Sequence, residues 1–299
     1  VIEEKDVDHS IYEVPLDLAN QELDVYVLEK LGLHVNRLRM TDWKKMVGHL
    51  IEPENGEITI AVVGKYIALQ DSYKSIYEAL THGGIANSVK VNLRRLESED
   101  IEAKSAARLL KGVDGILVPG GFGGRGIEGK IKAIQYAREH RIPFFGICLG
   151  MQCAVMEFAR NVCEMKKANS TEFKNGLKYP VIALMDEQKK ITAKGGTMRL
   201  GCYPCKLQDK TNARAAYKRA NIKERHRHRY EFNNEYRIIM EEYGLTFSGL
   251  SPDGTLVEII ELKDHPWFVA CQFHPEFQST PLKAHPLFRD FIATAMNPT

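Results

Sequence analysis

The chain has 299 residues, of which 44% are hydrophobic and 27% are charged, with 23 glycines and 12 prolines. These proportions are typical of a globular protein and exclude a disordered or collagen-like chain. The 41 basic and 39 acidic side chains give a net charge of +2, which is too small to indicate a general nucleic-acid or membrane-surface binder. The most apolar stretch, residues 142–158, is interrupted by proline, glycine and glutamine, so we expect no membrane span.

Six cysteines and no recognisable signal peptide predict a reducing, cytoplasmic setting rather than a disulfide scaffold. Cys202 and Cys205 form a single CxxC without a second pair of ligands, so we expect no metal site there. The chain begins at Val1 instead of methionine, which favours a fragment or a processed product.

The first part of the chain differs in composition from the rest. Residues 1–56 carry 6 basic and 12 acidic side chains, whereas residues 57–299 carry 35 and 27. Apolar spacing predicts helices over residues 14–31 and 41–51, followed by a turn-rich stretch at 53–56. Because these helices show little sign of a core of their own, we interpret residues 1–56 as an appendage with a linker and 57–299 as the main domain.

From residue 58 onward, short β-branched runs alternate with helical patterns. The expected strands lie at 58–63, 90–96, 115–118 and 143–147, and the expected helices at 73–82, 103–110, 127–140 and 151–160. Further strands at 181–184, 198–200, 245–248, 256–262 and 268–273 precede a last helix at 286–295. This order predicts an α/β fold of the flavodoxin-like, doubly wound kind, with a mostly parallel sheet, helices on both faces and added antiparallel strands.

The segment Gly146-Ile-Cys-Leu-Gly150 closes an apolar strand and opens a helix. It has the pattern of a nucleophile elbow with Cys148 in place of serine. A helix N-terminus lowers the pKa of a thiol placed on it, and the next backbone N–H is able to bind an oxyanion. The other interpretation is a small buried cysteine in a tight turn.

The glycine-rich segment 120–126 contains a GxGxxG pattern, and residues 124–130 read GxxxxGK. The first pattern follows the third strand instead of the first, and the second has Ile131 where a P-loop needs a hydroxyl. We therefore reject both nucleotide-binding interpretations. Strands three and four are expected to be parallel neighbours, which places this loop beside Cys148 with amides available for an oxyanion hole.

A strand ending near Phe273 leads into His274-Pro-Glu276. The proline fixes its own φ, so the turn is able to hold the Glu276 carboxylate against one ring nitrogen of His274 and leave the other for the thiol. Taken alone, such a tripeptide is also typical of a surface turn.

The run 223–230 alternates basic and histidine residues. It is too short for a nucleic-acid footprint. We interpret it as a strand that turns a guanidinium group toward a carboxylate ligand, or as a solvated edge strand.

Together, Pro119-Gly-Gly-Phe122, Gly146-Ile-Cys-Leu-Gly150 and Gln272-Phe-His-Pro-Glu276 resemble the class I (triad) glutamine amidotransferases. The segments at 65–66, 168–173, 195–200, 225–230 and 265–273 are more narrowly similar to the CTP synthase family. The likeness covers residues 57–295, and residues 1–52 are similar to the tail of that family's synthase domain and its linker.

The resemblance implies hydrolysis of L-glutamine to glutamate and ammonia, with Cys148 as nucleophile, His274 as base and acid and Glu276 as its orienting partner. Gly121, Phe122 and Leu149 would surround the oxyanion, and Gly120, Gln152, Glu172 and Arg229 would hold the amino-acid end of glutamine. No cofactor is implied for this step. In the full-length enzymes, which the resemblance implies are homotetramers, an N-terminal synthase domain uses the ammonia with ATP and Mg to convert UTP to CTP, and GTP is the allosteric activator.

One departure from the family concerns residues 185–194, which are shorter and less acidic than the lid that the family associates with GTP activation. Two other classes of function stay open on the residues alone. One is a Cys-dependent hydrolase such as a peptidase or deglycase relative, which would not need Glu172 and Arg229. The other is a glutamine-sensing or assembly module without turnover.

Overall fold

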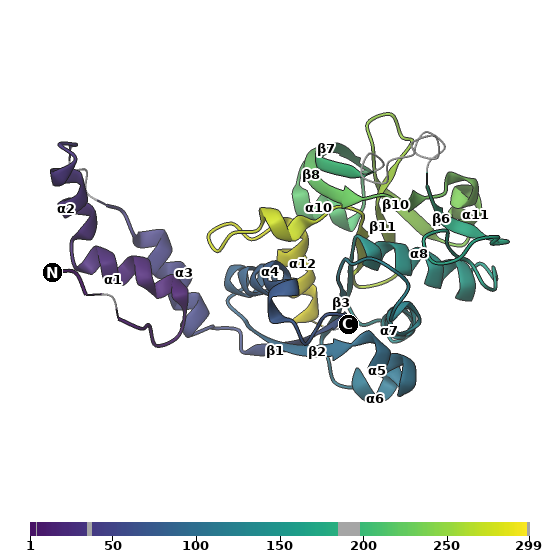
Figure 1. Cartoon of the computed structure of the whole chain (residues 1–299), viewed down its shortest axis with the longest axis horizontal. Helices are drawn as coiled ribbons and strands as arrows, with labels where there is room; N and C mark the ends of the chain where they lie inside the picture. Colours follow the sequence, from purple (N-terminus) through teal and green to yellow (C-terminus); the bar gives the residue numbers. More distant parts are fainter. Residues whose placement is uncertain (4, 35–37, 185–197, 298–299) are drawn as a thin grey trace.

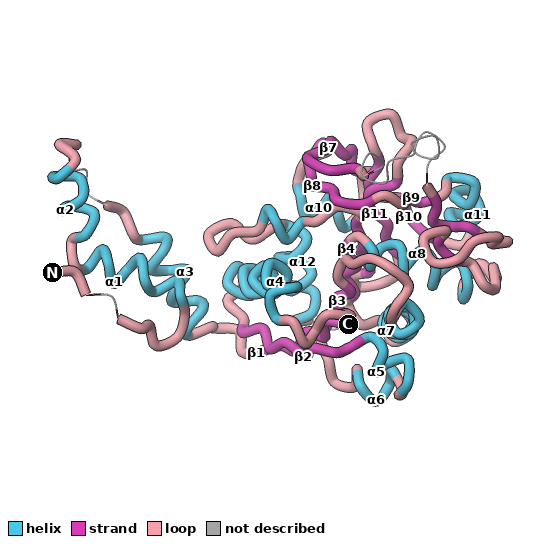
Figure 2. Tube along the Cα trace, in the orientation of Figure 1, coloured by secondary structure: helices cyan, strands magenta, loops and turns pink. Residues whose placement is uncertain are grey.

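A computed structural model describes residues 1–3, 5–34, 38–184 and 198–297. Its centre is a nine-stranded sheet with the strand order β2-β1-β3-β4-β12-β11-β10-β7-β8. Figure 2 shows these strands as the middle layer between helices. The predicted α/β class, with a largely parallel sheet and helices on both faces, is confirmed.

Five strands at one side of the sheet are parallel, in the order β2, β1, β3, β4 and β12. Their bounds are Lys90–Glu97, Glu57–Gly64, Gly115–Val118, Phe144–Ile147 and Phe268–Cys271. The last strand of the chain therefore lies directly beside the strand that precedes Cys148. The carboxyl ends of parallel strands meet at one edge, where α/β proteins place their sites.

The remaining strands of this sheet pair in antiparallel fashion. They are β11 (Val257–Leu262), β10 (Leu245–Leu250), β7 (Arg199–Leu207) and β8 (Asn221–His228). A second, three-stranded sheet contains β5 (Asn169–Ser170), β6 (Pro180–Ala183) and β9 (Glu231–Phe232). The sequence predicts β6, β7, β8, β10 and β11 as added strands, whereas the two-residue strands β5 and β9 were not predicted.

Side chains of β1 alternate between two cores, as a strand with both faces covered requires. Ile60 and Val62 face a core shared with α4, α10 and α12, whereas Ala61 and Val63 face one shared with α5, α7, α8 and α11. The helices of the first face span Lys74–Ala86, Asn212–Tyr217 and Pro286–Ala295. Those of the second face span Ser98–Ala103, Ile127–Glu139, Leu149–Asn161 and Arg237–Glu242, with α6 (Ala106–Leu109) beside them.

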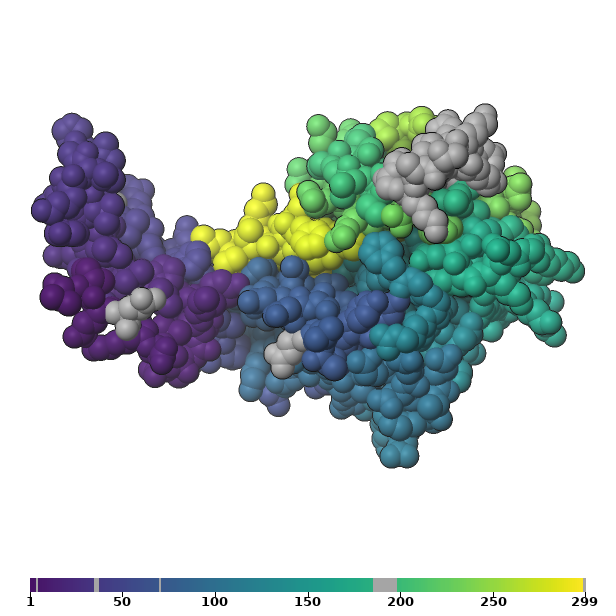
Figure 3. Space-filling model, in the orientation of Figure 1, coloured from purple at the N-terminus to yellow at the C-terminus, as the bar shows by residue number. Residues whose placement is uncertain are grey.

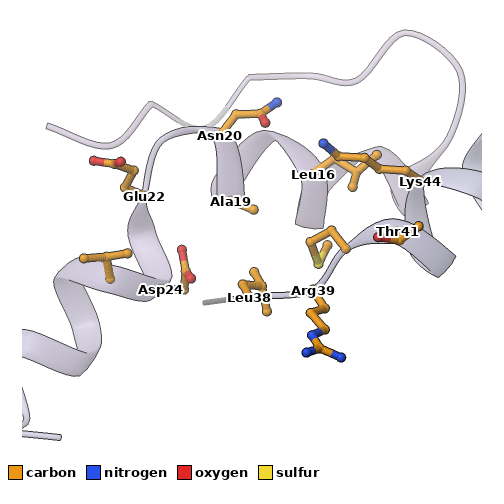
Figure 4. A pocket seen from close by; sticks show the side chains of 11 residues that line it. Leu16, Ala19, Asn20, Glu22, Asp24, Leu38, Arg39, Thr41 and Lys44 are labelled. Atoms are coloured by element: carbon orange, nitrogen blue, oxygen red, sulfur yellow. The ribbon is translucent and has the colours of Figure 1, made fainter. Parts of the chain in front are cut away.

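The N-terminal segment projects from this body as a separate group of helices (Figures 1 and 3). It consists of α1 (Val14–Asn20), α2 (Leu23–Lys30) and α3 (Thr41–Ile51), preceded by the 3-10 turn η1 (Ile11–Glu13). The prediction of one helix over 14–31 is wrong, because Glu22 adopts a left-handed backbone with φ 57°. Neither α1 nor α2 buries a residue within the described ranges. A hollow of about 730 Å³ opens between the three helices (Figure 4).

The segment contacts the body through a small cluster of its own. Met46 and Val47 of α3 pack on Ile85 of α4, with Tyr12 and Trp43 partly buried beside them. This cluster is separate from the two main cores. Helix α4 is thus covered by the sheet on one side and by the N-terminal segment on the other (Figure 1).

Two other details differ from the sequence-based elements. The helix predicted at 103–110 is only the short helix α6, and the unpredicted helix α5 precedes it, separated from it by Lys104 and Ser105. The short helices α10 and α11 were not predicted, since six residues carry too little periodicity to identify. The lid interpretation at 185–194 lies outside the described residues. In the described part of the chain, no helix has the length and apolar character needed to span a membrane.

Candidate active site

Cys148 lies at the sharp turn between β4 and α8, as a nucleophile elbow requires. Its backbone has φ 52° and ψ −105°, an uncommon combination for a residue with a side chain. The start of α8 is able to pass close to β3 because residue 150 is a glycine: a Cβ atom there would lie 2.1 Å from the Val118 carbonyl oxygen. Cys148 is 3% exposed and caps the N-terminus of α8, where the helix dipole favours a thiolate.

The glycine loop after β3 lies against this cysteine, as the parallel pairing of β3 with β4 requires. A Cβ atom on Gly120 would lie 3.4 Å from the Cys148 Cβ and 3.0 Å from His274 Cε1. Gly121 is in van der Waals range of Leu149, the first residue of α8. The glycine loop thus lies beside the first turn of α8, whose first N–H groups have no partner within the helix.

His274 and Glu276 follow β12 and form a pair. His274 Nδ1 and Glu276 Oε1 are 2.8 Å apart, and Glu276 is 7% exposed. The backbone N–H of His274 donates to the Arg225 carbonyl of β8 at 2.8 Å. Among the described residues, Nε2 of His274 is buried without a hydrogen-bond partner. That nitrogen is therefore available to a thiol or a substrate atom.

The electrostatics favour a charged imidazole. Burial lowers the pKa of His274, but the negative charge of a Cys148 thiolate and the hydrogen bond to Glu276 outweigh it and raise the pKa to about 10. The arrangement therefore favours the imidazolium form of His274.

Gln272 is a site residue to which sequence reasoning gave no role. Its Nε2 donates to the Cys148 sulfur at 3.7 Å, and its Oε1 accepts from Gln152 Nε2 at 3.2 Å. Gln152 also donates to the Tyr230 carbonyl at 3.0 Å. Gln152, predicted to bind substrate, thus lies next to the sulfur through Gln272. The only sequence signal for Gln272 was its place two residues before His274.

Three of the four predicted substrate residues, Gln152, Glu172 and Arg229, line one narrow hollow beside Cys148. Gly121 and Phe122 also form part of its wall, whereas Gly120 lines a wider cavity that also borders Cys148. The hollow measures about 20 Å³, which holds about one water molecule. A molecule the size of glutamine enters only if these walls move apart, and Phe122, 45% exposed, is the least confined of them.

Two side chains clamp the glycine loop at Gly123. Glu172 Oε1 accepts the Gly123 N–H at 2.8 Å, and Lys65 Nζ donates to the Gly123 carbonyl at 3.3 Å. Arg125 in turn donates to the Lys65 carbonyl at 2.7 Å. Glu172 therefore holds the glycine loop in place, a contact that the sequence did not suggest.

On its other side Cys148 borders a wider cavity of about 320 Å³. Tyr66, Phe122 and Phe277 form part of its wall, together with Arg227 of β8. Cys148 thus borders both the narrow hollow and this wider cavity.

The basic run forms the edge strand β8, in which every second residue is buried. His226 and His228 point inward, whereas Arg225 and Arg227 are exposed. The solvated-edge interpretation is correct for Arg225. Arg229, beyond the end of the strand, lines the narrow hollow instead.

Lys130 is in helix α7 rather than in a phosphate-binding loop. Its side chain is fully buried, and Nζ lies near Gly121 without a hydrogen-bond partner among the described residues. Burial lowers the pKa of Lys130 to about 8.

We expect Lys130→Met to stabilise the protein below pH 8 by about 1 to 3 kcal/mol. The unfolded chain holds the Lys130 proton up to about pH 10.5 and the folded chain only up to about pH 8. The free-energy cost of burying Lys130 therefore falls as the pH rises from about 8 to about 10.5. The stability advantage of Lys130→Met should shrink over the same pH range. Urea unfolding at pH 7 and pH 10 measures both values, and a variant less stable than wild type at pH 7 would contradict the expectation.

Cys202 and Cys205 of β7 do not form a ligand pair, since Cys202 is exposed and Cys205 is buried. Among the described residues, no cluster of three or more histidine, cysteine or acidic side chains has metal-binding geometry.

The fold and this geometry define an α/β domain with a cysteine nucleophile elbow and a facing histidine. A family model for class I glutamine amidotransferases matches residues 68–294, and the chain belongs to that family. CTP synthases of Caldanaerobacter subterraneus and Geotalea uraniireducens are 57% and 58% identical to it over 297 residues, which cover 99% of this chain and 55% of each relative. The chain therefore spans about half the length of these curated relatives.

Among solved structures, a glutaminase domain of Trypanosoma brucei CTPS with bound acivicin aligns with a TM-score of 0.76 and 38% identity. The alignment covers 81% of this chain and 95% of that chain. The sequence-based resemblance to this family is confirmed.

Proposed function

We propose that this chain is the glutaminase portion of a CTP synthase and hydrolyses L-glutamine through Cys148, His274 and Glu276. The observation that carries the proposal is the position of Cys148 at a helix N-terminus beside the His274–Glu276 pair, whose Nδ1–Oε1 distance is 2.8 Å. These are the three groups that a nucleophilic mechanism with an oriented base requires.

In the first half-reaction, the Cys148 thiolate attacks the side-chain amide carbon of glutamine and forms a C–S bond. The amide oxygen becomes an oxyanion near the amides of Gly121, Phe122 and Leu149. The imidazolium of His274 then gives its Nε2 proton to the amide nitrogen, the C–N bond breaks, and ammonia leaves a thioester behind.

In the second half-reaction, the neutral His274 removes a proton from water while the water oxygen attacks the thioester carbon. The C–S bond breaks, glutamate is released, and the thiolate and imidazolium are restored. Glu276 keeps Nδ1 of His274 as a donor throughout, which leaves Nε2 to exchange the proton. No cofactor takes part in these steps.

Substrate recognition follows from charge. Glu172 is an acceptor for the α-ammonium group of glutamine, and Arg229 is a donor for its α-carboxylate. Gln152, whose Nε2 already donates to Tyr230 and Gln272, forms the wall beside them, while Gly120 provides space beside the sulfur. The narrow hollow that Gln152, Glu172 and Arg229 line supports this assignment. A Cys-dependent peptidase on the same fold has no need for both charges.

We infer that the ammonia serves a synthase domain that aminates UTP with ATP and Mg, as the CTP synthase relatives suggest. Residues 1–56 are then the tail of that domain and its linker, and residues 57–299 the amidotransferase domain. GTP activation and a tetramer belong to the same proposal.

The direct test is hydrolysis of L-glutamine by the chain, with L-asparagine as the control. We expect ammonia and glutamate from glutamine and negligible product from asparagine, because the shorter side chain does not reach the sulfur. Mass spectrometry after treatment with acivicin should give one adduct on Cys148. Equal hydrolysis of both amides, or an adduct on another cysteine only, would refute the proposal. Acivicin binding to Cys148 without turnover would favour the glutamine-sensing alternative.

A further inference from the structure

The Glu276 carboxylate has a single side-chain partner among the described residues, so its position depends mainly on the backbone turn that carries it. Its Oε1 pairs with His274, and its Oε2 is buried without a hydrogen-bond partner in the described part of the chain. Glu276 lies in the 3-10 turn η5 (Pro275–Gln278), which closes with a bond from the Ser279 N–H to the Glu276 carbonyl at 3.4 Å. The carboxylate position therefore depends on what fixes this turn.

Two neighbouring side chains fix the turn from opposite sides. Gln278 Nε2 donates to the Lys223 carbonyl at 3.3 Å and to the Glu224 carboxylate, which ties the turn to β8. Ser279 Oγ lies 3.0 Å from His82 Nδ1, which ties it to helix α4. His82 is 4% exposed.

The second connection continues through His82 to the N-terminal segment. His82 Nε2 is 2.9 Å from the Tyr12 hydroxyl, which donates to Glu78 Oε2 at 2.7 Å. Tyr12 is itself fixed by the segment, because the Trp43 indole donates to the Tyr12 carbonyl at 2.8 Å. In Figure 1, α4 lies between the N-terminal helices and the last part of the chain.

The donors and acceptors along these hydrogen bonds have one consistent assignment. The Tyr12 proton goes to Glu78, so the Tyr12 oxygen accepts from His82 Nε2–H. A neutral imidazole then accepts at Nδ1 from the Ser279 hydroxyl, whose oxygen accepts the His285 N–H at 3.2 Å. Burial lowers the pKa of His82, which favours this neutral form. Every donor in the chain has an acceptor.

We propose that the partly buried chain of hydrogen bonds Tyr12–His82–Ser279 positions the turn that carries Glu276 and couples the N-terminal segment to the glutaminase centre. Tyr12, His82 and Ser279 are positioning residues, since none of them touches the reacting atoms. A displacement of the N-terminal segment moves Tyr12, and its effect reaches the His274–Glu276 pair through two side chains. This inference rests on the proposed glutaminase function.

The test is a double-mutant cycle of Tyr12→Phe and Ser279→Ala in the whole chain. Each change removes a hydroxyl, so we expect kcat for glutamine to fall about 3- to 10-fold with KM unchanged within about twofold. The kcat of the double variant should lie within about twofold of the kcat of the slower single variant, because one broken hydrogen bond already interrupts the connection. Ser279→Thr keeps a hydroxyl and should retain wild-type kcat. Tyr26→Phe, at a tyrosine of the same segment that is 54% exposed, is the matched control.

A second measurement does not need turnover. The rate at which iodoacetamide modifies Cys148, followed on its peptide by mass spectrometry across pH, reports the thiolate–imidazolium pair. Tyr12→Phe should shift this profile toward higher pH, and Tyr26→Phe should not. A wild-type chain that hydrolyses no glutamine would refute the proposed function. If wild type is active, three results would refute the coupling: kcat losses that multiply fully in the double variant, an unchanged kcat in the single variants, or an unshifted pH profile of Cys148 modification in Tyr12→Phe.

Discussion

Replacing Cys148 with alanine should reduce glutamine hydrolysis by at least about 10⁴-fold, because a triad that loses its nucleophile loses almost all of its rate enhancement. The change removes one sulfur atom that is 3% exposed, so the fold and the substrate hollow should persist. The measurement is glutamate release by the purified variant, together with its thermal unfolding. The bound substrate should still protect the variant against unfolding, since the groups assigned to its charged end are unchanged.

Cys153→Ala is the matched control, since Cys153 lies on the same helix α8 and is fully buried. Burial raises the pKa of Cys153 to about 12, so this thiol is protonated at neutral pH and is not a nucleophile. Its loss should affect hydrolysis only through packing. Substantial hydrolysis by Cys148→Ala would refute the covalent mechanism.

The fold was largely predictable because its signals are local. The alternation of short apolar strands with helical segments indicates parallel strands covered on both faces, and Ile60, Ala61, Val62 and Val63 show the result, with neighbours facing opposite cores. The adjacency of the third and fourth strands, expected from this order, is confirmed.

The proximity of the Cys148 elbow to the His274 turn was harder to predict from the sequence. The elbow and the His274 turn are more than a hundred residues apart in the sequence, and they meet because β12 pairs with β4, with Gly146 opposite Ala270 and Ile147 opposite Cys271. Nothing local determines that pairing. The resemblance to a known family, rather than any spacing, brought the two motifs together before the structure did.

Side-chain contacts across the site were not predictable at all. The bond from Gln272 to the Cys148 sulfur depends on the direction of a side chain at the end of β12. The burial of Lys130 contradicts the ordinary preference of lysine for water. Such features depend on packing between distant elements. The break at Glu22 is different, because neither α1 nor α2 buries a residue in the described part of the chain and nothing in the packing there explains it.

In the proposed function, Glu172 has two roles that a substitution by alanine would remove together. It accepts the Gly123 N–H at 2.8 Å, and it is the acidic side chain in the hollow assigned to the α-ammonium group of glutamine. Hydrogen bonding to Gly123 needs only an oxygen acceptor, whereas recognition of an ammonium group needs the charge. A glutamine at this position supplies the first without the second.

We therefore expect Glu172→Gln to raise KM for glutamine by about 2 to 4 kcal/mol, or about 30- to 800-fold, with little change in kcat. Glu172→Ala should raise KM as much and also lower kcat, because the loop that carries the Gly121 and Phe122 amides loses its acceptor at Gly123. Steady-state kinetics of both variants separate the two functions, with Glu241→Gln on the exposed side of α11 as control. An unchanged KM in Glu172→Gln would show that the Glu172 carboxylate does not recognise the substrate. Equal kcat in the two variants would show that the oxyanion loop keeps its shape without the clamp.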